Sequence, residues 1–213
     1  WRLPYSRRAL FPSPDEGLLT HAETTSGVRL RFATESRQVR LSFQPLPTTE
    51  PAAGRAGFHF DLTIGADLVQ SVSVAPGGDE ALFADLPAGD KIVEIWLSQE
   101  IPVALTGLKG DASCRPVAED RPRWVTYGSS LTHCVRAHSP ARTWPALVAR
   151  RRGLHLTSLG FGGQCHLDAM VGMIIADLPA DYITLKLGIN TISGSLSARS
   201  YPAAVVALVQ IIR

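Results

Sequence analysis

Short stretches in which apolar and polar residues alternate fill the chain from residue 27 to about residue 108. Val28, Leu30 and Phe32 alternate with other residues, which is the spacing of a β-strand with one buried face. Turn sequences, such as Pro-Ala-Gly-Asp at residues 87–90, separate the stretches. Short strands at this spacing predict an antiparallel β-sandwich of the jelly-roll type. The expected strands cover residues 27–33, 39–43, 58–62, 68–74, 81–86, 92–97 and 103–108.

The pattern changes after residues 115–123, which are rich in proline and charge and which we interpret as a linker. Beyond it, apolar runs alternate with stretches of helical periodicity, which predicts a parallel sheet with α/β crossovers. Ser139-Pro140 indicates a helix start, and Gly153 indicates its end. We therefore predict two domains, residues 1–118 and residues 119–213. Further expected elements are strands at 124–127, 155–159 and 182–187 and helices at 167–178 and 200–212.

Composition narrows the class of protein. Of the 213 residues, 45% are hydrophobic and 19% are charged, and the formal net charge is +2. A nearly neutral chain gives no reason to expect a nucleic acid as partner, and no apolar run approaches the about 20 residues of a membrane span. No signal peptide is visible, and the few cysteines slightly favour a cytoplasmic location. The chain starts at Trp1 rather than methionine, so the location stays open. The oligomeric state is open as well.

The three cysteines, Cys114, Cys134 and Cys165, are too few and too scattered for a disulfide framework. The pairs His133-Cys134 and Cys165-His166 match no common metal motif, so we expect no metal and no cofactor. Aromatic residues in the sandwich could form a sugar-binding platform, but their alternating placement favours core packing. They are Phe43, Phe58, Phe60, Phe83 and Trp96.

The sequence Tyr-Gly-Ser-Ser-Leu-Thr at residues 127–132 lies where an expected strand meets a helix start. A serine there is exposed at the end of the sheet, close to helix N–H groups and to the positive end of the helix dipole. This placement suits a nucleophile whose reaction generates an oxyanion. Ser130 is therefore the candidate nucleophile.

Two further segments follow expected strands and suit the same reaction. In a parallel α/β sheet the carboxyl ends of the strands lie along one edge, where ligands bind. Gly163 would let a backbone N–H approach a substrate with no Cβ in the way, and Asn190 offers a side-chain NH₂ donor. We predict that the backbone N–H groups of Ser130 and Gly163 and the Asn190 amide form an oxyanion hole.

These segments resemble, in order, three sequence blocks of the SGNH hydrolases, also called the GDSL family. Residues 128–132 resemble the Gly-Asp-Ser-Leu block, residues 158–163 the block that holds the oxyanion glycine, and residues 188–190 the Gly-x-Asn block. The resemblance covers residues 124–213, and the sandwich resembles the β-domain that precedes the hydrolase domain in some members. It implies a flavodoxin-like parallel sheet and an acyl-Ser130 intermediate.

The sequence departs from the family pattern at two points. Ser129 stands where the family has an aspartate that hydrogen-bonds within the site. The Asp-x-x-His block, which supplies the general base and its orienting carboxylate, is missing, because no Asp here has a His three positions later. We expect that pair beyond Arg213, which would make residues 119–213 the N-terminal portion of the domain. Ser129, His133 and His166 are candidate pocket-lining residues.

The resemblance implies a serine esterase or acyltransferase acting on a small-molecule ester or thioester, such as an acylated carbohydrate or natural product. Hydrolysis is favoured, and transfer of the acyl group to an alcohol is the alternative. The two reactions share every step before the acceptor attacks, so the sequence does not separate them. A non-catalytic carbohydrate-binding module is a second alternative. The acyl donor, the acceptor and the role of the sandwich also stay open.

Overall fold

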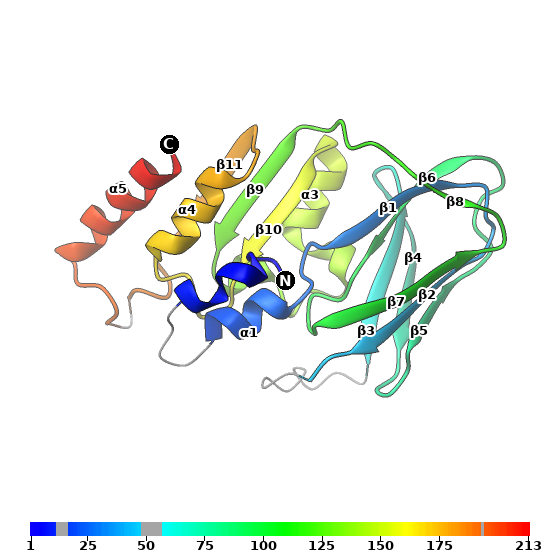
Figure 1. The fold of residues 1–213 in the computed structure, drawn as a ribbon, viewed down its shortest axis with the longest axis horizontal. Helices are drawn as coiled ribbons and strands as arrows, with labels where there is room; N and C mark the ends of the chain where they lie inside the picture. The colour runs from blue at the N-terminus through cyan, green and yellow to red at the C-terminus, as the bar shows by residue number, and fades with distance from the viewer. Residues whose placement is uncertain (12–16, 48–56, 193) are drawn as a thin grey trace.

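The computed structural model describes residues 1–11, 17–47, 57–192 and 194–213. Figure 1 shows two parts side by side, antiparallel strands on the right and a parallel sheet with its helices on the left. The predicted combination of a β-sandwich and an α/β unit is therefore confirmed. Within the described ranges, no helix has both the length and the apolar character that crossing a membrane requires.

The sandwich consists of two antiparallel sheets, with strand orders β4-β3-β6-β1-β8 and β5-β2-β7. Their facing sides carry the alternating apolar residues that the sequence pattern predicts, such as Val39, Leu41 and Phe43 of β2, all buried. The strands are β1 (Arg29–Thr34), β2 (Val39–Pro45), β3 (Phe58–Ile64), β4 (Asp67–Val74), β5 (Glu80–Phe83), β6 (Lys91–Trp96), β7 (Val103–Gly110) and β8 (Cys114–Pro116).

The aromatic residues of the sandwich form core rather than a platform. Phe43, Phe60 and Phe83 are buried between the two sheets, and Phe58 packs against the same core. Trp96 is buried on the opposite side of its sheet, where it faces the α/β unit. The favoured interpretation of these residues as core packing is therefore confirmed, and the alternative of a sugar-binding platform is wrong.

Strand β8 lies at the start of the segment that we predicted to be a linker. Its three residues pair with β1, with Arg115 opposite Ala33. So short a run that ends in proline carries no alternation, which is why the sequence pattern missed it.

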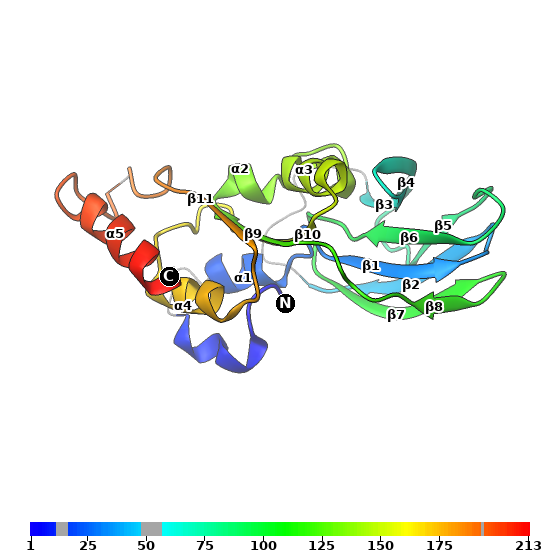
Figure 2. The same ribbon diagram turned by 90° about the horizontal axis from the view of Figure 1, so that it is seen from above.

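The parallel sheet contains β9 (Arg123–Gly128), β10 (His155–Gly160) and β11 (Tyr182–Lys186) in the order β10-β9-β11. The chain thus crosses first to one side of β9 and then to the other. Since such crossovers are right-handed, their helices must cover opposite faces. Figure 2 shows α2 and α3 on one face and α4 on the other. The helices are α2 (Ser130–His133), α3 (Trp144–Arg152), α4 (Ala169–Asp177) and α5 (Ser200–Ile212), with a 3-10 turn η2 (Pro140–Arg142).

Two helices begin later than the sequence predicts. Ser139-Pro140 opens only the short η2, and Thr143 caps α3 by accepting a hydrogen bond from the N–H of Ala146. α3 ends at Gly153 as predicted, in a left-handed conformation with φ of 61°. α4 begins after Asp168, because Leu167 has a φ of 65° and cannot belong to a helix.

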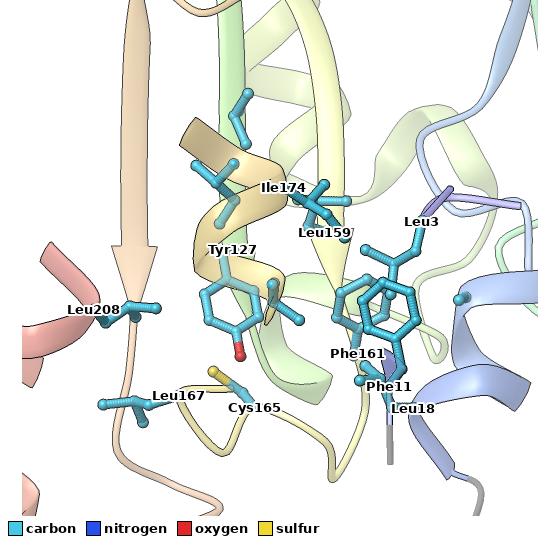
Figure 3. Packing of buried hydrophobic residues seen from close by; sticks show 14 residues of the cluster. Leu3, Phe11, Leu18, Tyr127, Leu159, Phe161, Cys165, Leu167, Ile174 and Leu208 are labelled. Carbon is cyan, nitrogen blue, oxygen red and sulfur yellow. The ribbon is translucent and has the colours of Figure 1, made fainter. Parts of the chain in front are cut away.

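The described residues of the N-terminal segment pack on the α/β unit. It contains a 3-10 helix η1 (Tyr5–Leu10) and α1 (Gly17–Glu23). Figure 3 shows Leu3, Phe11 and Leu18 against Phe161, which follows β10. The predicted domain boundary at residue 118 stays a prediction, but these residues join the hydrophobic core of the second part.

The two parts meet through a small core of their own. Trp96 of β6 packs with Trp124 of β9 and with Ala146 of α3. Beside it, the buried carboxylate of Asp61 accepts a hydrogen bond of 2.7 Å from the N–H of Ala141. Apolar contact combined with a buried charge-assisted hydrogen bond fixes the α/β unit against the outer face of the larger sheet.

A chain of charged groups lines the same junction. Glu94 of β6 accepts hydrogen bonds from Arg29 at 3.4 Å and from Arg121 at 2.5 Å. Arg121 also binds Glu119, which in turn lies 2.8 Å from Nδ1 of His155 on β10. Hydrogen bonds from Arg121, and then from His155, hold the pKa of Glu119 well below its usual value. The network therefore joins the sandwich, the linker and the parallel sheet.

We expect the contribution of Glu119 to stability to depend on pH. Its folded pKa is below the ordinary value of 4.5, so the carboxylate stabilises the fold above that pH and less as the pH falls further. The difference in free energy of unfolding between wild type and Glu119→Gln should shrink between about pH 5 and pH 3. Urea denaturation at several pH values measures it. Glu80→Gln, which removes an exposed carboxylate near Arg40, is the control. If the difference in free energy of unfolding between wild type and Glu119→Gln does not shrink as the pH falls, the assignment is contradicted.

Candidate active site

The carboxyl ends of the three parallel strands are level. Gly128 of β9 pairs with Gly160 of β10 on one side and with Lys186 of β11 on the other. The segments that contain Ser130, Gly163 and Asn190 therefore leave the sheet at one edge. The helices that follow β9 cover the face opposite to that covered by α4, so β9 ends at a topological switch point, where open α/β sheets bind ligands.

Ser130 is the first residue of α2 and is exposed. Its backbone N–H and its Oγ form no hydrogen bond with any group in the described part of the chain. α2 is only four residues long and is followed by Cys134, which has a φ of 57°. A single helical turn has only a small dipole, so the dipole contributes less to anion stabilisation at Ser130 than the sequence predicts. The N–H groups of the first turn can still donate hydrogen bonds to an anion.

Two glycines let α2 lie directly on the strand ends. A Cβ on Gly160 would collide with the backbone N of His133, and a Cβ on Gly128 would collide with Oγ1 of Thr132. Neither residue was a candidate from the sequence. The sequence feature that could have identified them is a glycine at the last position of each of two neighbouring strands, where a helix crosses the strands.

Gly163 follows β10 in a run that we call the glycine loop, residues 160–163. It has a φ of +71°, which favours glycine, and no atom lies near the position of a Cβ. The backbone conformation, rather than crowding within the fold, is thus what requires glycine. Its N–H donates to no group of the described chain, while its carbonyl oxygen lies 2.9 Å from Nε2 of His166.

Asn190 lies in a tight turn after β11, which Thr191 closes by donating its backbone N–H to the carbonyl of Gly188 at 2.9 Å. The Asn190 Oδ1 accepts a hydrogen bond of 2.9 Å from the N–H of Cys165. This bond ties the turn to the segment that follows the glycine loop. It also orients the amide so that its oxygen faces Cys165 and its NH₂ group is the donor end.

Buried side chains support the edge from below. Figure 3 shows the Tyr127 hydroxyl directed at the sulfur of Cys165, with Leu167 beside them. Burial raises the pKa of Tyr127 well above its ordinary value and raises the pKa of Cys165 to about 11. Both groups are therefore neutral at physiological pH, and Cys165 is a packing residue, as the sequence predicts, and not a nucleophile.

His133 lies beneath the site rather than in an open cleft. The ring is 1% exposed, and its Nε2 lies 2.9 Å from the carbonyl oxygen of Gln99 in the loop after β6. Burial, with Arg2 and His21 nearby, lowers the pKa of His133 to about 3, so the ring is neutral. This placement does not support a role for His133 in lining a pocket.

His166 is partly exposed and lies on the segment after the glycine loop, 3.0 Å from Oγ of Ser195. Across residues 1–11, 17–47, 57–192 and 194–213, no histidine nitrogen forms a hydrogen bond with Ser130. The general base that Ser130 would need is therefore not in contact with it in this part of the chain.

Ser129 is 2% exposed, and its Oγ has no hydrogen-bond partner among the described residues. It therefore lies under the site and not on its surface. The sandwich supports the same region through Gln99, whose side chain donates to the carbonyl of Ala137 at 3.0 Å. The loop after β6 thus holds the chain that follows α2, a role that the sequence did not reveal.

A cavity of about 380 Å³ lies beside the Asn190 turn and is lined in part by Gly188, Ile192, Leu196 and Tyr201. Its lining is mainly apolar. In the part of the chain that the structure describes, no group of three His, Cys, Asp or Glu side chains is placed to hold a metal ion.

Two protein families match the chain. Residues 1–103 match the family described as the SsfX3 N-terminal domain, and residues 121–210 match the GDSL-like lipase/acylhydrolase family. No curated protein matches it significantly. Residues 104–120 lie between the two matches.

Solved structures share this arrangement. SsfX3, a salicylyl-acyltransferase from a tetracycline biosynthetic pathway, is 34% identical with a TM-score of 0.88, over 100% of this chain and 61% of that one. A protein from Bacteroides ovatus described as a GDSL-like lipase is 18% identical with a TM-score of 0.75, over 98% and 63%. A family two carbohydrate esterase from Clostridium thermocellum is 12% identical with a TM-score of 0.66, over 89% and 68%. The chain thus spans less than two thirds of the first two.

Proposed function

Residues 121–210 belong to the GDSL-like lipase/acylhydrolase family and follow an SsfX3 N-terminal domain, and from this premise we propose that the protein is a serine-dependent acyl-transfer enzyme. The observation that carries the proposal is the level edge of the parallel sheet. Gly128, Gly160 and Lys186 pair there, so Ser130, Gly163 and Asn190 follow from neighbouring strand ends. An exposed hydroxyl, together with the backbone N–H groups of Ser130 and Gly163, which donate to no acceptor among the described residues, is what acyl transfer requires.

The proposed reaction begins when Ser130 Oγ attacks the carbonyl carbon of an ester or thioester and its proton passes to a histidine that acts as general base. Among the described residues no histidine is hydrogen-bonded to Ser130. The resulting oxyanion accepts hydrogen bonds from the N–H groups of Ser130 and Gly163 and from the Asn190 NH₂. Collapse of this intermediate breaks the bond to the leaving group, which takes the proton from the histidine. The product is an acyl-Ser130 ester.

The acceptor then attacks the acyl-Ser130 carbonyl and gives its proton to the same base. Collapse of this second intermediate breaks the bond between the acyl carbon and Ser130 Oγ, which takes the proton back from the base and completes the cycle. We favour a small-molecule alcohol as the acceptor, because the chain is 34% identical over its whole length to an acyltransferase. We therefore prefer transfer to the hydrolysis that the sequence analysis favours. The sequence identities to the carbohydrate esterases are low, so these matches support only a shared fold. The apolar cavity beside Asn190 would take the acyl group.

Trapping the acyl-enzyme tests this proposal. The full-length protein is mixed with a p-nitrophenyl acyl ester, quenched in acid within the burst, digested and analysed by mass spectrometry. We expect the acyl mass on the peptide that contains Ser130. Release of p-nitrophenol without acylation of that peptide would contradict the mechanism.

Adding an alcohol to the same reaction separates the two acceptors. A transferase should form a new ester in water and should accelerate turnover as the alcohol concentration rises, whereas a hydrolase should release only the free acid. Release of free acid alone at every alcohol concentration would assign hydrolysis and contradict our choice of acceptor.

A further inference from the structure

Arg2 joins the N-terminal segment to the carboxyl end of β10. Its Nη1 donates to the carbonyls of Gly160 at 2.7 Å and Ser158 at 3.3 Å. Its Nε donates to the carbonyl of Thr24 at 2.9 Å, and its Nη2 donates to Thr24 Oγ1 and to the carbonyl of His21. A planar guanidinium with this many acceptors is fixed in place, because its donors point in set directions.

These contacts bear on the first peptide of the glycine loop. Gly160 turns its carbonyl toward Arg2, and the next N–H, that of Phe161, donates to the carbonyl of Gly128 at 2.9 Å. The guanidinium also lies over the Phe161 ring, 4.8 Å from its centroid. The peptide between Gly160 and Phe161 is thus held on both sides, which sets the direction in which Gly162 and Gly163 leave the strand.

The second half of the loop rests on two rings. A Cβ on Gly162 would lie 3.4 Å from the ring of His21 and 3.6 Å from Nδ1 of His133. These rings pack edge to face with centroids 5.2 Å apart. Arg2 binds the backbone of His21 on one side and Gly160 on the other, so it links this support to the strand end.

No carboxylate in the described part of the chain pairs with Arg2. Arg2 is partly buried. Removing part of a guanidinium from water costs solvation free energy, which here is offset by neutral oxygen acceptors and by the Phe161 ring, and by no carboxylate of the described residues. Apolar side chains would fill such a site at lower cost, as Leu3 and Phe11 do next to it. Packing alone therefore does not explain a cation at this position. Its positive charge would also stabilise the negative charge of the oxyanion that forms next to the glycine loop.

We propose that Arg2 is a positioning residue for acyl transfer, which holds the glycine loop so that the Gly163 N–H points into the oxyanion hole. The inference rests on the proposed function, because it assigns a purpose to the loop geometry. It also means that one side chain of the N-terminal segment, that of Arg2, supports the site from outside the α/β unit.

Kinetics and hydrogen exchange on Arg2→Ala in the full-length protein test the proposal. We expect kcat for ester cleavage to fall about 10- to 100-fold with KM changed less than about threefold, because misplaced donors weaken transition-state binding. Amide exchange in residues 160–164 should quicken at least about tenfold. Arg2→Lys, which keeps the charge but loses the planar fork, should be intermediate in both readouts, and it decides the matter if Arg2→Ala does not fold.

Leu3→Ala is the matched control, because it removes a buried neighbour on the same segment that donates nothing to β10. It should lower Tm and keep kcat within about threefold of wild type. The proposal is overturned if Arg2→Ala keeps the kcat and the amide exchange of wild type; Arg2→Lys takes its place if only that variant folds. It is also overturned if Leu3→Ala loses as much kcat as Arg2→Ala when the two variants lose the same Tm. Faster exchange in Arg2→Ala together with activity that survives Ser130→Ala would instead refute the proposed function and leave the loop contact in place.

Discussion

Replacing Ser130 by alanine should lower kcat for ester cleavage by about 10⁴-fold or more, the loss expected when a nucleophile is removed and only the oxyanion donors remain. The side chain is exposed at the end of β9 and makes no hydrogen bond within the described ranges, so little else depends on it. Stability should change by no more than about 0.5 kcal/mol. Steady-state kinetics with a p-nitrophenyl ester, together with a thermal melt, measure the two effects.

Ser129→Ala is the control for this variant, since it removes the neighbouring hydroxyl. Ser129 is buried and its Oγ has no partner in the described chain, so we expect activity within about tenfold of wild type and no loss of fold. Equal activity of Ser130→Ala and wild type would rule out the nucleophile. A collapse of activity in Ser129→Ala alone would instead show that the position of the family aspartate retains an essential role here.

The local pattern of apolar and polar residues was sufficient to predict most of the helices and strands. The helix at residues 200–212 has the predicted bounds, and every predicted strand overlaps an observed one, because alternation and helical periodicity report burial directly. The rule that parallel strands present their carboxyl ends at one edge was sufficient to bring Ser130, Gly163 and Asn190 to one edge of the sheet.

What the sequence did not reveal depends on contacts between distant residues. Arg2 and Gly160 are 158 positions apart, and no local signal marks an arginine that binds a strand end. Leu167 has a left-handed conformation that its side chain does not favour, so tertiary packing imposes it and delays the start of α4. Gln99 supports the chain after α2 from the other part of the molecule. The roles of such residues can be recognised only from the three-dimensional arrangement of the sandwich and the α/β unit.

The sandwich and the α/β unit act as one structure. The loop after β6 supports the chain beyond α2, Asp61 binds the backbone of Ala141, and Trp96 fills the junction. A module that only bound carbohydrate would not need to bury its surface in this way. The arrangement instead favours a sandwich that fixes the position of the nucleophile segment, which gives the N-terminal half a role that the sequence left open.

Asn190→Ala should lower kcat about 10²- to 10³-fold with a small change in KM, as expected for the loss of one oxyanion donor. The variant removes two interactions, however. The NH₂ group would donate to the oxyanion, and Oδ1 accepts the hydrogen bond of 2.9 Å from the N–H of Cys165 that ties the turn to the neighbouring segment. A fall in kcat could then come from a displaced turn rather than from a lost donor.

Asn190→Asp separates the two effects, because it keeps an acceptor for the Cys165 N–H and replaces the donor by a second carboxylate oxygen. We expect it to lose at least as much kcat as Asn190→Ala, since a carboxylate there repels the oxyanion, while amide exchange at Cys165 stays slow. In Asn190→Ala that exchange should quicken. Retention of kcat within about threefold in Asn190→Asp would exclude the donor role, because the amide would then matter only for holding the turn.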